Sequence, residues 1–345
     1  MIAISKSPVA RILAGLFVAI LVTGLLREVR SFSSSAPDFP CNKHSGTEVE
    51  IAISQGQTGS AIAKALASKK VVKSSESFFR KAVADTRATR ISPGIHRVNV
   101  GLCARQALDQ LLDPKRIVGL ISISEGAWVS EVLPQMYAAG FLKSDVQKAI
   151  ANSKKPNGFN EIEGLLFPAQ YSFAKGTSAQ TAIESMISRA ETAMTNSGFY
   201  VTKEKFTPKQ LLVIASLIQA EGKEKDFAQI SQVIRNRLTI GMPLQFDSTV
   251  HFVKKSRGNI FLSTRSTLIS SPYNTYRRYG LPPGPINNPG QAAMRAAVTP
   301  QSGDWLYFIT VAPADTRFTS DVNQFSKWKI EYKKNLRAGK FRSSE

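Results

Sequence analysis

The spacing of apolar residues divides the chain into short strands and amphipathic helices. Strands are expected at 49–54, within 92–100, at the start of 117–141 and, as a buried strand, at 305–311. Helices are expected at 60–68, 74–85, 103–113, the later part of 117–141, 178–194, 207–221 and 227–241. The stretch 280–290 holds four prolines and three glycines, which predicts a stiff loop. This mixture of elements predicts an α+β fold.

The N-terminus carries an apolar run at 9–26 that contains Arg11. Its uninterrupted part, 12–26, would span about 22 Å as a helix, and only the whole run approaches the ~30 Å of a bilayer core. An uncleaved membrane anchor is favoured over a cleaved signal peptide, because Arg27 and Arg30 follow the run where a small-x-small cleavage site would stand.

Composition and length then divide the chain into a membrane segment and two domains. The stretch after the apolar run is rich in Ser, Pro and polar residues, which is typical of a linker. The expected boundaries are a cytoplasmic tail at 1–8, a transmembrane helix at 9–26, a linker at 27–47, a small α/β module at 48–115, a larger mixed α+β domain at 116–335 and a basic tail at 336–345.

The net charge of +20 over 345 residues attracts polyanions such as anionic lipid or wall polymer. The cations are dispersed and do not form a basic helix with interleaved aromatic residues, so nucleic acid is not expected as a partner. The two cysteines, Cys41 and Cys103, lack metal-binding spacing. Outside the cytoplasm they would form a disulfide between linker and small module, and the alternative is two unrelated thiols.

Glu221 ends a strongly apolar helix and is followed at once by Gly222. At about 100° per residue it lies about 20° from Ile214, on the apolar side of the helix. A carboxyl group in apolar surroundings has a raised pKa and can act as a general acid near neutral pH. The alternative is a buried ion pair with an arginine of the next helix, Arg235 or Arg237.

Polar and aromatic side chains gather in the segments before and after this helix. Amides and carboxylates hydrogen-bond sugar hydroxyls and aromatic rings stack on sugars, so together they favour a polysaccharide groove over unrelated turns and core aromatics. The candidates are Glu163, Tyr171, Gln245, Asp247, Asn274 and Tyr276. The three histidines form no metal-ligand pair, and neither a P-loop nor a G-x-S-x-G elbow occurs, so no metal and no cofactor are expected.

Six ordered motifs resemble the YceG-like endolytic murein transglycosylase family: EGLLFPAQY, ASLIQAEG, VIRNRLTIGMPLQFDSTV, SPYNTY, GLPPGPINNPG and AAMRAAVTP. The resemblance is strong over 117–332 and weaker over 48–114, which resembles the family's LysM-like module. It implies a single-pass protein of the cell membrane with its body on the extracytoplasmic side. It also implies that the larger domain is catalytic, with a helix-borne glutamate that cleaves glycan strands of new peptidoglycan within the chain.

The resemblance assigns the catalytic acid to Glu221 and adds Asn288 to the groove residues. The expected activity is that of a peptidoglycan lyase: a lytic transglycosylase that cleaves the bond between N-acetylmuramoyl and N-acetylglucosaminyl residues, leaves 1,6-anhydro ends and limits strand length. The expected partners are glycan strands, the cell membrane and cell-wall synthases. Two alternatives stay open: a non-catalytic peptidoglycan-binding scaffold, and a hydrolase of the same bond, which needs a second carboxylate.

The sequence departs from the family near its C-terminus. Thr316 and Phe325 stand where many members have histidines, whereas Phe318 matches the family pattern. We expect these histidines to be structural or dispensable in the family, and the alternative is a weakened enzyme.

Overall fold

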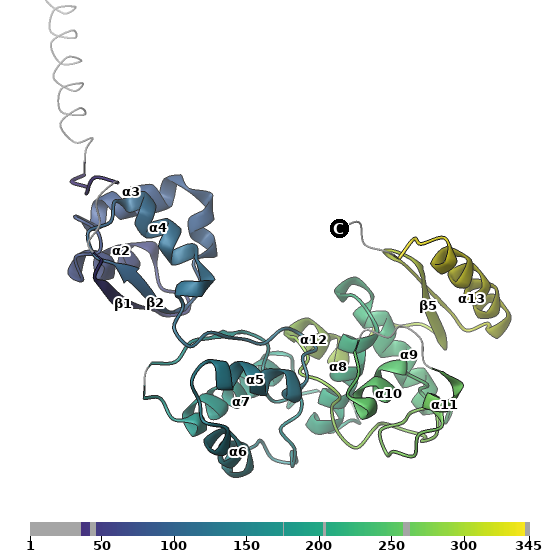
Figure 1. Ribbon diagram of the computed structural model, residues 1–345. Helices are drawn as coiled ribbons and strands as arrows, with labels where there is room; N and C mark the ends of the chain where they lie inside the picture. The colour runs from purple at the N-terminus through teal and green to yellow at the C-terminus, as the bar shows by residue number, and fades with distance from the viewer. Residues whose placement is uncertain (1–35, 42–45, 175, 203–204, 258–262, 342–345) are drawn as a thin grey trace, which may run out of the picture. The chain divides into compact units, whose positions relative to one another are not determined.

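The computed structural model describes residues 36–41, 46–174, 176–202, 205–257 and 263–341, which fall into two compact units divided between Val118 and Gly119 (Figure 1). Both units combine helices with two-stranded antiparallel sheets, so the predicted α+β fold is confirmed. The division lies close to the boundary expected between 115 and 116.

The predicted cytoplasmic tail at 1–8 and transmembrane helix at 9–26 lie outside the described residues, as does most of the predicted linker. Among the helices that the structure describes, none combines the length and the apolar character needed to cross a bilayer. The membrane anchor therefore stays a prediction from the sequence.

The first unit places two helices between the strands of one antiparallel pair. β1 (Glu48–Ile53) pairs with β2 (Gly94–Asn99). The connection contains α2 (Gly59–Ser68), α3 (Ser75–Ala84) and the short helix η1 (Thr86–Arg90), and α4 (Ala104–Leu112) and η2 (Pro114–Arg116) follow β2. The apolar helix faces pack on the sheet around Leu66, Phe78 and Val98, which are all fully buried. The helices predicted in this unit are confirmed.

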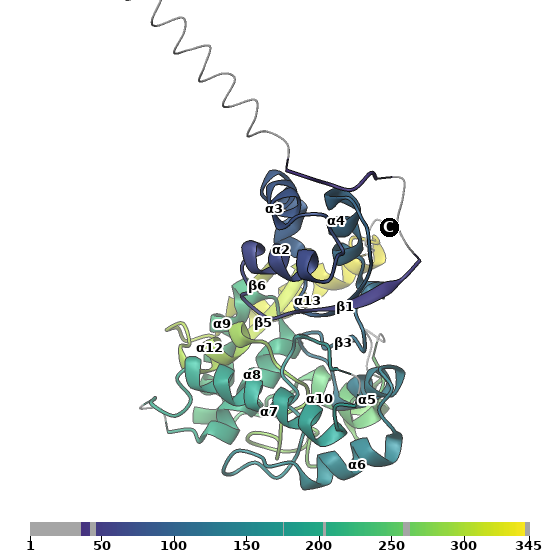
Figure 2. The same ribbon diagram turned by 90° about the vertical axis from the view of Figure 1, so that its left-hand side faces the viewer.

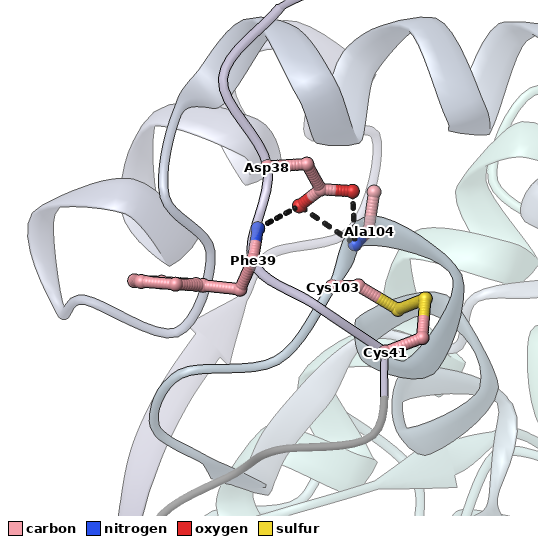
Figure 3. The surroundings of a disulfide bond; sticks show 5 residues. All are labelled: Asp38, Phe39, Cys41, Cys103 and Ala104. Atoms are coloured by element: carbon pink, nitrogen blue, oxygen red, sulfur yellow. Dashed lines mark hydrogen bonds between the residues drawn. A yellow bond between two sulfur atoms is a disulfide. The ribbon is translucent and has the colours of Figure 1, made fainter.

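Cys41 and Cys103 form a disulfide (Figure 3). Beside it, the carboxylate of Asp38 accepts hydrogen bonds from the backbone N–H groups of Phe39 and of Ala104, the first residue of α4. A carboxylate in this place satisfies N–H groups that lack a helical partner and interacts favourably with the helix dipole. Of the two alternatives, the structure has the disulfide and not two separate thiols, and the bond joins the predicted linker to the first unit.

The second unit consists mainly of helices (Figure 2). Its elements are β3 (Ile121–Ser122), α5 (Val129–Ala138), α6 (Lys143–Asn152), β4 (Gln170–Tyr171), α7 (Ala179–Asn196), α8 (Pro208–Glu221), η3 (Glu224–Asp226), α9 (Phe227–Thr239), α10 (Asp247–Lys254), α11 (Thr264–Thr267), α12 (Gln291–Val298), β5 (Tyr307–Ala312), β6 (Asp315–Thr319) and α13 (Val322–Arg337). The sequence did not predict α6, β4, α10, α11, α12, β6 and α13.

Helix α8 lies in the middle of the core of this unit. Thr207 and Gln210 form a capping box at its start, where each side chain bonds the other's backbone N–H group. All residues of 211–218 are buried, because α9, α10 and α12 pack against the helix. A helix that is apolar on every side is buried on every side, and its last residue, Glu221, is held where the core ends.

The predicted strand at 305–311 forms, but it is not buried. β5 and β6 make an isolated hairpin, in which Val311 is the only buried residue of β5. Helix α13 packs on β5 (Figure 1). An apolar run alone does not reveal whether both faces of a strand are covered, and here a two-stranded sheet leaves its side chains half-buried.

Candidate active site

Glu221 is the last residue of α8, and Gly222 turns the chain away from the helix with an extended backbone. A Cβ atom at Gly222 would lie 2.2 Å from Cδ1 of Ile230, on α9. The glycine thus allows α9 to pack directly against the end of α8. This close packing holds the Glu221 carboxyl at the edge of the core, partly exposed.

The Glu221 carboxyl accepts one side-chain hydrogen bond, from the hydroxyl of Ser248 at 2.5 Å. Burial raises the pKa of Glu221 to about 7. The bond from Ser248 acts against this change, whereas the negative charge of Asp247 adds to it. A carboxyl group with this pKa is half-protonated near neutral pH and can both give and take a proton.

The alternative of an ion pair with Arg235 or Arg237 is not what the structure shows. Glu221 forms no ion pair with a residue that the structure describes. The guanidinium of Arg237 instead donates to the carbonyl oxygens of Leu244 and Leu306 and lies over the ring of Tyr307. Its positive charge lowers the pKa of Glu221, but less than burial raises it.

A pocket of about 340 Å³ lies beside the end of α8. The residues next to Glu221 in sequence and in hydrogen bonding, Ala220 and Ser248, belong to its wall. The full lining is Glu125, Gly126, Trp128, Gln219, Ala220, Ser248, His251, Arg257, Ile286 and Asn287. The acid is therefore next to a pocket of mixed polar and apolar character.

Asp247 and Tyr276 form a second polar pair near Glu221. Asp247 is the first residue of α10, and its carboxylate accepts a short hydrogen bond from the Tyr276 hydroxyl. Burial and this carboxylate raise the pKa of Tyr276 above its ordinary value. Gln245 is exposed, with a left-handed backbone (φ 50°) held by a hydrogen bond from its N–H to Thr275. Asp247 lies close enough to Glu221 for its negative charge to raise the pKa of that carboxyl group.

Glu163 is a second carboxyl group with a raised pKa. It accepts hydrogen bonds from the backbone N–H of Val129 at the start of α5. Burial raises its pKa to about 7, and the charge of Arg257, a residue of the pocket wall, lowers it in part. The described hydrogen bonds of Glu163 go to Val129, which directly follows Trp128 of the pocket wall, and not to Glu221.

Three residues predicted to line the groove have structural roles instead. Tyr171 is 7% exposed and donates its hydroxyl to the carbonyl oxygen of Phe167. Asn274 and Asn288 are fully buried, and both amides are taken up by hydrogen bonds within the protein. Asn274 accepts from the N–H of Tyr276, so it positions a residue of the site without facing the pocket.

The C-terminal positions that depart from the family motif are occupied by ordinary packing and hydrogen bonds. Thr316 donates to the buried carboxylate of Asp226 at 2.9 Å, and Phe325 stacks on Tyr307 with ring centroids 5.0 Å apart. The first contact joins β6 to η3, and the second joins α13 to β5. Among the described residues, no group of metal-binding side chains could hold an ion.

Comparison with known proteins places this geometry in a family. The model of the YceG-like family matches residues 51–331. The chain belongs to the YceG-like family. An endolytic murein transglycosylase of Bacillus subtilis (strain 168) is 31% identical over 316 residues, which cover 85% of this chain and 87% of that protein.

Two further proteins are similar to this chain. An endolytic murein transglycosylase of Streptococcus pneumoniae (strain D39) is 35% identical over 153 residues, which cover 43% of this chain and 28% of that protein. The crystal structure of a yceG-like protein from Listeria monocytogenes matches with a TM-score of 0.57 and 25% identity, over 82% of this chain and 99% of that chain.

Several residues of the site in this YceG-like chain were not predicted from its sequence. Ser248 directly follows Asp247, but a serine at the start of a helix is an ordinary finding, and its bond to Glu221 depends on how α10 packs on α8. Trp128 and Arg257 stack with 4.0 Å between the guanidinium carbon and the ring centroid, although they are far apart in the sequence. No local signal marked them, since tertiary packing creates the contact.

Proposed function

We propose that this chain cuts peptidoglycan glycan strands internally, at the bond between N-acetylmuramoyl and N-acetylglucosaminyl residues, and leaves 1,6-anhydro ends. The class of enzyme, a lytic transglycosylase, follows from its family and from the relative that it matches over most of its length. The bond, the anhydro product and the control of strand length are the proposal.

One observation supports it above the others: Glu221 is a carboxyl group with a pKa of about 7, beside a pocket and outside any ion pair with the described residues. A non-catalytic scaffold has no need of such a group. Burying a carboxyl group with this pKa costs stability at neutral pH, so a function for its proton explains why it is present.

The reaction needs one carboxyl group in two roles. Protonated Glu221 donates to the glycosidic oxygen, the bond from that oxygen to C1 of the muramoyl residue breaks, and the leaving sugar keeps the proton as a hydroxyl. The muramoyl residue becomes an oxocarbenium-like cation. Its C6 hydroxyl then attacks C1 and returns its proton to the Glu221 carboxylate. No water is consumed, and the enzyme regains its starting protonation state.

The neighbours of Glu221 have supporting roles in this scheme. Ser248 stabilises the carboxylate that exists between the two proton transfers, because its hydroxyl donates to Oε1. The charge of Asp247 stabilises the cation on the sugar, while Tyr276 fixes its carboxylate by a hydrogen bond. Hydrolysis of the same bond would use Asp247 as nucleophile or base, and its products would carry reducing ends.

The location proposed for this reaction is the outer side of the cell membrane, where nascent strands and their synthases are found. The disulfide Cys41–Cys103 supports an oxidising compartment, since such bonds are rare in the reducing cytoplasm. The apolar run at 9–26 supports a membrane anchor, and the charge of +20 supports attraction to anionic lipid or wall polymer.

The test is product analysis by mass spectrometry with the full-length protein and purified glycan strands. We expect shorter strands whose new ends are lighter by one water than reducing ends. Glu221→Gln should abolish this cleavage, whereas Glu224→Gln, a change at an exposed glutamate of the same segment, should retain it. Reducing ends would establish a hydrolase, and normal anhydro products from Glu221→Gln would refute the assignment of the acid.

A further inference from the structure

The stiff loop at 280–290 contributes two residues to the pocket beside Glu221, Ile286 and Asn287. Both are held against the buried middle of α8. The N–H of Ile286 donates to the hydroxyl of Ser216, and Nδ2 of Asn287 donates to the carbonyl oxygen of Ser216 at 2.8 Å. Asn287 is 2% exposed, so its side chain has one fixed position.

The other end of this amide, Oδ1 of Asn287, is buried and has no hydrogen-bond partner among the described residues. The orientation of the amide follows from chemistry: the Ser216 carbonyl oxygen can only accept, so the nitrogen must face it and the oxygen must face elsewhere. A buried acceptor without a donor is costly and needs an explanation. Because Asn287 lines the pocket, a bound molecule can supply the missing donor.

A second amide in the same wall, that of Gln219, can donate a hydrogen bond. Oε1 of Gln219 accepts the backbone N–H of Gly290 at 2.9 Å, which leaves its Nε2 as the end that can donate. Ile286 and Trp128 add apolar surface to the wall. The residues that line the pocket thus include an amide with an unpaired acceptor, an amide with an available donor, and apolar side chains.

We propose that this pocket is a subsite for the 2-acetamido group of a substrate sugar. Oδ1 of Asn287 accepts the acetamido N–H, Nε2 of Gln219 donates to the acetyl oxygen, and the methyl group contacts the apolar wall. A sugar 2-hydroxyl, which is shorter than the acetamido group, supplies neither the acetyl oxygen nor the methyl group. The inference rests on the proposed function, because it places an N-acetylated residue of the glycan strand next to Glu221.

Binding tests the subsite without depending on cleavage. The probes are β-1,4-linked tetramers of N-acetylglucosamine and of glucose, which differ only in the acetamido group. We expect calorimetric titration of full-length Glu221→Gln to show at least about ten-fold weaker binding of the glucose tetramer, the effect of one well-placed hydrogen bond in a buried site. Asn287→Ala in this background should weaken the N-acetylated tetramer about ten-fold and leave the glucose tetramer unchanged.

Controls separate recognition from structural damage. Asn323→Ala, at an exposed asparagine of α13, should change neither affinity. Equal losses for both tetramers in Asn287→Ala would show a structural role and overturn the proposal, as would equal affinities in the Glu221→Gln protein, which would mean that Oδ1 has another partner. Product analysis remains separate: anhydro ends without acetamido selectivity would leave the proposed function intact and refute only this subsite.

Discussion

Ser248→Ala should shift the pH dependence of the enzyme towards alkaline values. The change removes the 2.5 Å hydrogen bond that stabilises the ionised form of Glu221 and lowers its pKa. A hydrogen bond to a charged group contributes about 1.5–3 kcal/mol, and 1.36 kcal/mol corresponds to one pKa unit. The net effect is smaller, because the serine hydroxyl also forms a hydrogen bond with the protonated acid. We therefore expect the pKa of Glu221 to rise by about one unit in Ser248→Ala.

The sign of the effect follows from the form that reacts. The first step needs protonated Glu221, so activity falls as pH rises through its pKa. With a pKa of about 7 in the native protein, about 3% of Glu221 is protonated at pH 8.5. With a pKa one unit higher, as expected for Ser248→Ala, about a quarter of Glu221 is protonated at pH 8.5. The ratio of variant to native activity should therefore rise several-fold between pH 6 and pH 8.5, even though loss of positioning lowers the variant's activity at acid pH.

The assay is kcat/KM for release of anhydro-ended fragments between pH 5 and pH 9. Ser248→Thr, which keeps the hydroxyl, should follow the native profile. Asp247→Asn should move the alkaline limb in the opposite direction, because the charge of Asp247 raises the pKa of Glu221. A profile for Ser248→Ala that is lower at every pH but not displaced would refute the electrostatic role of this hydroxyl.

Three further outcomes test other parts of the structure. The raised pKa of Glu221, from 4.5 to about 7, corresponds to about 3 kcal/mol in the free energy of unfolding. This contribution is fully present below pH 4.5 and is lost as the pH rises through 7. Glu221→Gln should therefore raise the melting temperature by several degrees at pH 8 and by little at pH 4.5. Gly222→Ala should lower activity and reduce the free energy of unfolding, measured in urea, by about 1–3 kcal/mol, because the new Cβ meets Cδ1 of Ile230. A second change, Ile230→Val, removes Cδ1 and should restore both activity and stability. Reducing the disulfide Cys41–Cys103, which joins residues 62 positions apart, should destabilise the first unit by about 2–4 kcal/mol. The measurement is faster proteolysis of the first unit, and cleavage of glycan strands by the same sample is the control for the second unit.

The sequence predicted those parts of the molecule that local pattern determines. The apolar run at 207–221 predicted a helix with Glu221 on its apolar side, and the resemblance made Glu221 the expected acid; the helix is α8. The clustering of polar and aromatic residues predicted Asp247 and Tyr276, which do form a hydrogen bond. Asn288 has the residue type of a sugar ligand, yet its amide is used inside the fold, and no local signal distinguishes the two uses. Ser248 could not be predicted, since only the packing of separate elements brings it to the acid.

The carbonyl oxygen of Leu306 is one of two backbone acceptors for the buried guanidinium of Arg237. Leu306 directly precedes β5, so the segment that leads into the C-terminal hairpin helps to solvate a cation whose charge acts on Glu221. A chain that ended before Leu306 would leave Arg237 short of an acceptor inside the core. We therefore expect a truncation before Leu306 to disturb the surroundings of Glu221 while Glu221, Ser248 and Asp247 are all still present.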